Sequence, residues 1–176
     1  MKEIHRSKNA LQKGFVADLV ASKGPWVITR SEGNDTEIRV HSYEGDLLAS
    51  VDTKQINNLQ LAVSDDGCLF GCAAWSPGVK LFEVKAKEGN FQKAGEDTKI
   101  IREANLQLPD YNNTTLHFSR DDSVIIVVSG CSLYLLKTED LTLINAIENI
   151  TSQPIEKLIV APNNKFMIIS AVNPKP

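Results

Sequence analysis

Three residues of types used in hydrolytic catalysis alternate along one short strand-like run and into the turn that follows it: His117, Ser119 and Asp121. A nucleophilic serine needs a general base within hydrogen-bond reach and a third group that orients this base. The run TLHFS has the β-branched and aromatic composition of a strand, in which same-face neighbours lie about 7 Å apart. That separation is too long for proton transfer. We therefore interpret these residues as polar side chains near a strand end, and predict that the chain has no catalytic residue and is not an enzyme.

Metal and cofactor sites are also poorly supported by the residue types. Cys68 and Cys72, with a distant histidine, could suggest zinc, but structural zinc sites use a second pair of closely spaced ligands and the sequence has none. The segment Asp65-Asp66-Gly67 lacks the alternating acids and final glutamate of a calcium loop. It is interpreted as a hairpin turn. The glycines are scattered singly, without a phosphate-binding loop. We expect no metal, no cofactor and no small-molecule substrate.

The composition limits the classes of partner. The chain has 176 residues, with 22 acidic and 19 basic side chains and a net charge of −3. This balance argues against a surface that grips nucleic acid or an anionic membrane. Apolar runs such as VIIVVSG are far shorter than a membrane span, and the first residues have no apolar core like that of a secretory signal. We expect no membrane contact by the chain itself, and reduced, buried cysteines.

The elements that must position all these residues are short strands that recur in a fixed order. Tight turns, built from residues that tolerate positive φ, are predicted at Lys23-Gly24, Asp66-Gly67, Asp121-Asp122 and Asn163-Asn164. The intervals between them are 43, 55 and 42 residues, so the period is close to 42 once an insertion in the middle interval is removed. A four-stranded propeller blade needs roughly 40–45 residues. The repeat therefore predicts an all-β fold, a partial WD-repeat β-propeller with about three and a half four-stranded blades.

The domain plan follows from the turns. Residues 1–13 are a lead-in segment or the end of a preceding blade, and the last unit is truncated after its second strand because the chain ends there. Each blade of a propeller buries its two faces against its neighbours, so this plan favours a fragment of a longer protein. The predicted blades cover residues 14–53, residues 56–99 with an insertion following to 112, residues 113–149, and, truncated, residues 154–176.

One region of the sequence resembles a known family. Its motifs are the segments Gln55 to Asn58, Ala62 to Gly67, Pro77 to Lys80 and Lys87 to Gln92. These resemble the WD-repeat proteins of the transducin β-like family, although Phe82-Glu83 stands where such repeats carry Trp-Asp, and no Gly-His pair occurs. The resemblance implies a propeller on the cytosolic face of the endoplasmic reticulum, anchored through an N-terminal segment of a longer parent protein. A cytoplasmic location is the alternative.

The family resemblance also implies partners. Its members are linked to the unfolded-protein response through a stress-sensing kinase, and to the translation machinery. We therefore expect a protein-interaction scaffold in the endoplasmic-reticulum stress response. The alternative is an RNA- or ribosome-associated propeller in translation regulation, against which the acidic net charge argues mildly.

A partner site is predicted where two loops meet on one face of the second blade. The loop between successive blades and the loop between strands two and three of a blade open on the same face, and a tryptophan in a Pro-Gly loop is a typical binding anchor. The alternative is that Trp75 folds back to cap its own blade, whereas Trp26, at the start of a strand, is expected in the core. The candidate residues are Gln55, Asn57, Asn58, Trp75 and Pro77.

Overall fold

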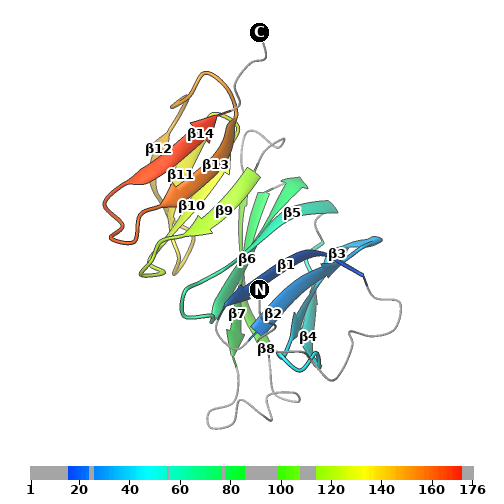
Figure 1. Ribbon diagram of the computed structural model, residues 1–176. Helices are drawn as coiled ribbons and strands as arrows, with labels where there is room; N and C mark the ends of the chain where they lie inside the picture. Colours follow the sequence, from blue (N-terminus) through cyan, green and yellow to red (C-terminus); the bar gives the residue numbers. More distant parts are fainter. Residues whose placement is uncertain are drawn as a thin grey trace, which may run out of the picture.

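A computed structural model describes residues 16–23, 26–54, 56–76, 78–85, 99–107 and 114–171 of the chain. Within these ranges the secondary structure consists of β-strands and turns (Figure 1). The strands are β1 (Ala17–Lys23), β2 (Trp26–Ser31), β3 (Asn34–His41), β4 (Leu47–Asp52), β5 (Ile56–Val63), β6 (Leu69–Ser76), β7 (Gly78–Lys85), β8 (Lys99–Gln107), β9 (Thr114–Phe118), β10 (Val124–Ser129), β11 (Ser132–Lys137), β12 (Leu143–Ile147), β13 (Ile155–Val160) and β14 (Met167–Ala171).

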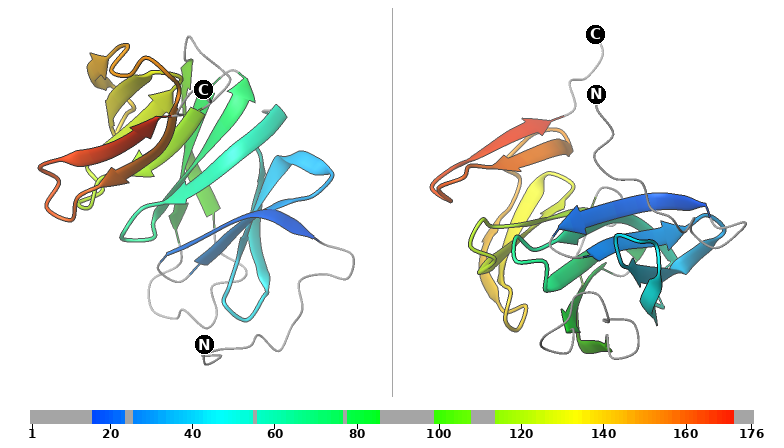
Figure 2. Two further views of the ribbon diagram at one scale, coloured as in Figure 1. Left: turned by 45° about the horizontal axis from the view of Figure 1, so that its top comes forward. Right: turned by 60° about the horizontal axis from the view of Figure 1, so that its bottom comes forward.

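The strands form four consecutive antiparallel sheets. Blade 1 contains β1 to β4, blade 2 contains β5 to β8 and blade 3 contains β9 to β12, each as a meander in chain order, and blade 4 contains β13 and β14. Figure 2 shows the sheets fanned out like the blades of a propeller, with the first strands β1, β5 and β9 side by side on the inner side of the fan. The predicted all-β propeller architecture is confirmed.

The turns that defined the repeat lie between the first and second strands of their blades. Ser64 to Cys68 joins β5 to β6, and Ser119 to Ser123 joins β9 to β10. Ala161 to Phe166 joins β13 to β14 in the same way. Gly67, Asp122 and Asn164 occupy the same position in the three turns, and their φ angles are 75°, 57° and 56°. Glycine, aspartate and asparagine are the residues that tolerate this left-handed conformation best.

Blade 2 extends further along the chain than its sequence predicts. The sequence predicts that this blade ends at residue 99 and is followed by an insertion to residue 112, whereas Lys99–Gln107 is the fourth strand and pairs with β7. The sequence KIIREANLQ contains three charged residues and gives a weak strand signal. Its pairing is enforced by the exposed backbone edge of β7. Residues 86–98, which separate β7 from β8, lie outside the described residues.

The core consists of apolar layers between successive blades. Trp26, Ile28 and Val40 of blade 1 pack with Phe70 and Phe82 of blade 2, which confirms the prediction that Trp26 is a core residue. The rings of Phe70 and Phe82 are stacked with centroids 5.0 Å apart. Equivalent layers lie between blades 2 and 3 and between blades 3 and 4. Blade-to-blade packing therefore supplies the core.

None of the described residues forms a helix of the length and apolarity that a membrane crossing requires.

Candidate interaction surfaces

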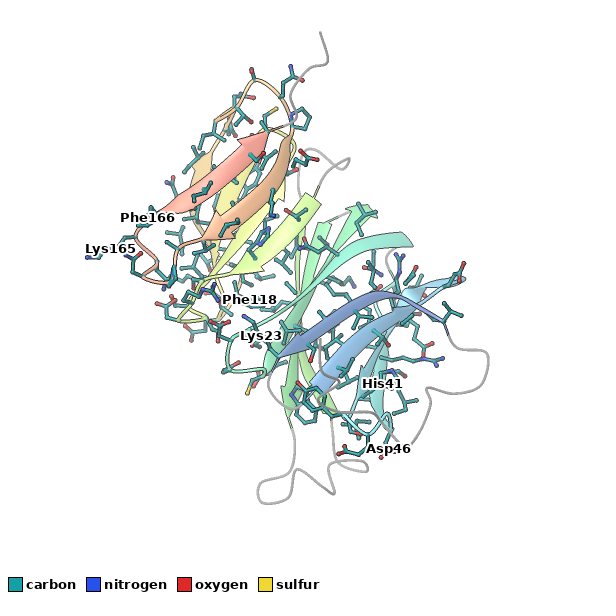
Figure 3. All side chains as sticks on the ribbon, viewed as in Figure 1. Lys23, His41, Asp46, Phe118, Lys165 and Phe166 are labelled. Carbon is teal, nitrogen blue, oxygen red and sulfur yellow. The ribbon has the colours of Figure 1, made fainter. Side chains whose placement is uncertain are left out.

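A groove runs along the first strands of all four blades. Its walls come from β1, β5, β9 and β13, and its volume is about 360 Å³. Arg120 and Ile159 are exposed along it, and Lys23 and Phe118 are partly buried; Lys23 and Phe118 are labelled in Figure 3. First strands meet here because their outer neighbours, the second strands, occupy the other backbone edge of each. The groove thus combines contributions from units that are far apart in sequence.

The floor of this groove is fixed by contacts between blades 2 and 3. The side-chain oxygen Oε1 of Gln60, on β5, accepts a hydrogen bond of 2.7 Å from the backbone N–H of Leu116, on β9. β9 is the edge strand of its sheet, and Gln60 supplies the acceptor that a further strand would otherwise provide for this N–H group. Gly71 on β6 lets Leu116 approach, because a β-carbon at Gly71 would collide with the Cδ2 methyl group of Leu116.

At one end of the groove the charged side chains are linked to each other. Lys23 forms an ion pair with Asp65, and Nη1 of Arg120 lies 3.7 Å from the other carboxylate oxygen of Asp65. These side chains come from blades 1, 2 and 3 respectively. All three are part-exposed, so the pairs contribute little stability individually. Their effect is to hold two cationic side chains at the rim.

The turns below this rim interlock from blade to blade. The carboxylate of Asp122 in blade 3 accepts hydrogen bonds of 2.7 and 2.8 Å from the backbone N–H groups of Asp65 and Asp66 in blade 2. Asn164 in blade 4 repeats the arrangement, because its Oδ1 accepts a 2.8 Å bond from the backbone N–H of Arg120 in blade 3. At the equivalent position blade 2 has Gly67, which has no side chain, and the ion pair between Lys23 and Asp65 joins blades 1 and 2 instead.

Each turn is also closed internally by the same pattern of side chains. Ser64 donates a 2.6 Å bond to Asp66 and accepts one from the backbone N–H of Leu69. In blade 3, Ser119 donates a 2.6 Å bond to Asp121 and accepts one from the backbone of Val124. The hydroxyl groups of Ser119 and Ser123 hold the pKa of Asp121 below its usual value. The turns are therefore rigid platforms at the edge of the groove.

The residues considered as a hydrolytic trio are not arranged as one. The imidazole of His117 lies 3.4 Å from the hydroxyl of Thr115, while Ser119 bonds to Asp121. Burial lowers the pKa of His117, which favours the neutral ring. Ser119 and Asp121 build the turn, as the interpretation of these residues as polar side chains near a strand end requires.

The predicted partner residues of blade 2 lie at strand ends. Asn57 and Asn58 belong to β5 and Trp75 to β6, and the backbone of Ile56 pairs with that of Ser76, so the structure does bring the two segments together. Gln55 and Pro77 lie outside the described residues, as do the side chains of Asn57 and Trp75.

Asn58 does not fit the role predicted for it. Its side chain is fully buried, and its Nδ2 donates a 3.1 Å hydrogen bond to the hydroxyl of Thr53. Its backbone carbonyl accepts a bond from Arg30. An asparagine at this place links blades 1 and 2 from inside, and a partner on the surface cannot reach its side chain. The sequence suggested exposure because asparagine is a common loop residue.

The expectation of buried cysteines is correct for one residue of three, since Cys131 is only partly buried. Cys72 is buried in β6, but Cys68 is exposed and precedes this strand, in the turn. All three cysteines are free thiols. The residues of the inner groove, Lys23, Phe118, Arg120 and Ile159, were not identified from the sequence. The feature of the sequence that could have identified them is their position beside the repeated turns.

Comparison with known proteins is consistent with this geometry. No model of a known protein family matches the chain. The β-propeller domain of Cps50 (Swd1) from Myceliophteria thermophila superposes with a TM-score of 0.69 over 90% of this chain and 48% of that chain, at 9% sequence identity. Human transducin beta-like protein 2 is 30% identical over 118 residues, which are 66% of this chain. The mouse protein is 27% identical over 110 residues.

The chain has the blade architecture of a β-propeller and is similar in sequence to transducin beta-like protein 2. It spans about a quarter of the length of these curated relatives, since the matches cover 25% and 23% of them. The inner groove and the rim of turns are the surfaces that its described blades expose.

Proposed function

We propose that this chain is the part of a scaffold that binds a stress-sensing kinase in the endoplasmic-reticulum stress response, and that the inner groove is its contact surface. The choice of pathway follows from what the resemblance to the transducin β-like family implies, and the similarity to transducin beta-like protein 2 supports that resemblance. The observation that carries the choice of surface is the convergence of four blades on one groove. A partner seated there contacts every blade at once.

The chemistry of the groove suits a folded protein partner. Ile159 is 48% exposed and offers an apolar contact, while Lys23 and Arg120 provide cations at one end. Both cations are already close to Asp65, which weakens their attraction for the regularly spaced phosphates of RNA. An acidic or phosphorylated loop of a kinase can still compete for them at a single point.

Binding to the purified cytosolic domain of a stress-sensing kinase tests the proposal. Arg120→Glu reverses one charge, and Ile159→Asp places a charge in the apolar part of the groove; both side chains are part-exposed, so the fold is retained. We expect the double variant to bind at least about tenfold more weakly than the unchanged chain. Leu143→Asp is the matched control, because Leu143 is 50% exposed on β12, away from the groove.

Two results would reject the proposal. If the unchanged chain shows no kinase binding, the choice of partner is wrong. If the groove variant and the Leu143 control bind equally, the choice of surface is wrong. A salt-dependent affinity for an RNA oligonucleotide that exceeds kinase binding would favour the translation-related alternative.

A further inference from the structure

A second groove lies between blades 2 and 3, on the far side of the interlocked turns from the inner groove. Its volume is about 660 Å³. Its apolar part is formed by Leu69 of β6, Val124 of β10 and Ile144 of β12. Ile144 is 50% exposed, and Leu69 and Val124 are partly buried. The groove therefore presents an apolar strip that remains open to a ligand.

The charged side chains along this groove are predominantly acidic. Four carboxylates, those of Asp66, Glu83, Asp122 and Glu139, accompany one cation, Lys137. The local balance of −3 equals the net charge of the whole chain, −3. Negative charge is thus concentrated here, although the complete sequence is almost balanced.

Two of the carboxylates are held in fixed positions. Asp66 accepts bonds from Ser64 and from the backbone N–H of Cys68, and Asp122 accepts two backbone bonds from the neighbouring turn. Fixed charges do not have to be ordered when a ligand arrives, so little entropy is lost on binding. Burial raises the pKa of the neighbouring Cys68 thiol, and the carboxylates of Asp66, Glu83 and Asp122 raise it further.

We propose that this groove binds a basic segment of a partner protein, with lysine or arginine side chains at the carboxylates and an apolar side chain against Ile144. Charge complementarity selects this occupant over an acidic or neutral peptide. A metal ion is a poorer fit, because no group of three potential ligands that could hold one occurs within the described part of the chain.

Two segments of the chain itself are alternative occupants of this groove, and their charges distinguish them. Residues 86–98 contain two lysines and three acidic residues, so their charge does not complement the groove. Residues 1–14 contain Lys2, Arg6, Lys8 and Lys13 against one acid, Glu3. This second segment is the competing occupant that the experiment must separate from a partner.

Fluorescence anisotropy with a labelled twelve-residue peptide of alternating lysine and leucine tests the proposal on the whole chain. The double variant Glu139→Gln and Ile144→Ser removes one charge and one apolar contact from the groove. The matched control, Glu156→Gln with Ile168→Ser, makes the same changes at exposed positions of blade 4. We expect about tenfold weaker binding for the groove variant and unchanged affinity for the control. Binding should weaken with added salt.

The proposal is overturned if the chain does not bind the peptide at low salt, or if the two variants lose affinity equally. A chain that begins at Phe15 and binds the peptide tenfold more tightly would assign the groove to residues 1–14 instead of a partner. The inner-groove variant, Arg120→Glu with Ile159→Asp, should bind the peptide normally. Failure here is therefore independent of failure in kinase binding.

Discussion

Replacement of Asp122 should show how strongly the turns hold adjacent blades together. Its carboxylate accepts two backbone hydrogen bonds, from Asp65 and Asp66, and its own φ is 57°. Asp122→Ala removes both bonds. It also leaves an alanine in the left-handed region, without the local side-chain hydrogen bonds by which aspartate tolerates it, and this costs about 1 kcal/mol. Loss of two partly exposed charge-assisted bonds costs about 1–2 kcal/mol more. We expect the free energy of unfolding to fall by about 2–3 kcal/mol.

Two further substitutions separate the causes. Asp122→Gly relieves the backbone strain, as Gly67 does at the same position of blade 2, so it should cost only about 1–2 kcal/mol. Asp122→Asn keeps one acceptor and tolerates positive φ. It also removes an ionisation cost, because burial and the nearby carboxylate of Asp66 raise the pKa of Asp122 despite its backbone hydrogen bonds. The asparagine variant should therefore lie within about 1 kcal/mol of the unchanged chain.

The pH dependence has a definite sign. The pKa of Asp122 is raised above 3.8 in the folded state, so its protonated carboxyl stabilises the fold below pH 3.8. This contribution is lost as the pH rises through the raised pKa. The stability of Asp122→Asn relative to the unchanged chain should increase over that window.

Urea unfolding at several pH values measures these differences, and amide hydrogen exchange reports on the backbone of Asp65 and Asp66. Equal stability of Asp122→Ala and the unchanged chain, with equal protection of the two amides, would refute the reasoning.

Further substitutions test the packing and the titration of one buried histidine. Gly71→Ala should lower the free energy of unfolding by about 1–3 kcal/mol because of its collision with Leu116, and Leu116→Ala in the same chain should relieve the collision, so that the two effects are not additive in denaturant titrations. Gln60→Ala leaves the Leu116 N–H without its acceptor and should cost about 1–2 kcal/mol, with faster exchange of that amide. Phe70→Ala empties a fully buried site and should cost about 3–5 kcal/mol; a smaller loss in urea unfolding would contradict the assigned core. Because the pKa of His117 is lowered in the folded state, its neutral ring stabilises the fold above pH 6.5, and this stability is lost as the pH falls through the lowered pKa. The free energy of unfolding of His117→Gln should therefore depend less on pH over that range.

The order of strands was predictable because each repeat carries its own turn. The residues at Gly67, Asp122 and Asn164 must adopt positive φ, which only a few residue types tolerate, so the turns are visible in the sequence. The edge strand β8 could not be predicted from the sequence, because strands at the outside of a blade need no apolar side chains on their exposed face. Pairing with β7 is a tertiary effect that a local pattern does not contain.

The candidate surfaces were less predictable than the fold. Asn58 was expected at a surface, and its burial depends on Thr53 and Arg30 from the preceding blade. Lys23 and Arg120 are ordinary polar residues in sequence, and only the blade-to-blade packing brings both to Asp65. Such groupings arise from residues about one repeat apart, so no short motif marks them.

Hydrogen–deuterium exchange of the chain with and without the kinase domain tests the central claim most directly. If the blades form a scaffold that holds its partner in the inner groove, protection should increase along β5, β9 and β13 and at the turn that contains Arg120. Unchanged exchange in these strands, with protection confined to the outer strands β4 and β12, would contradict the account.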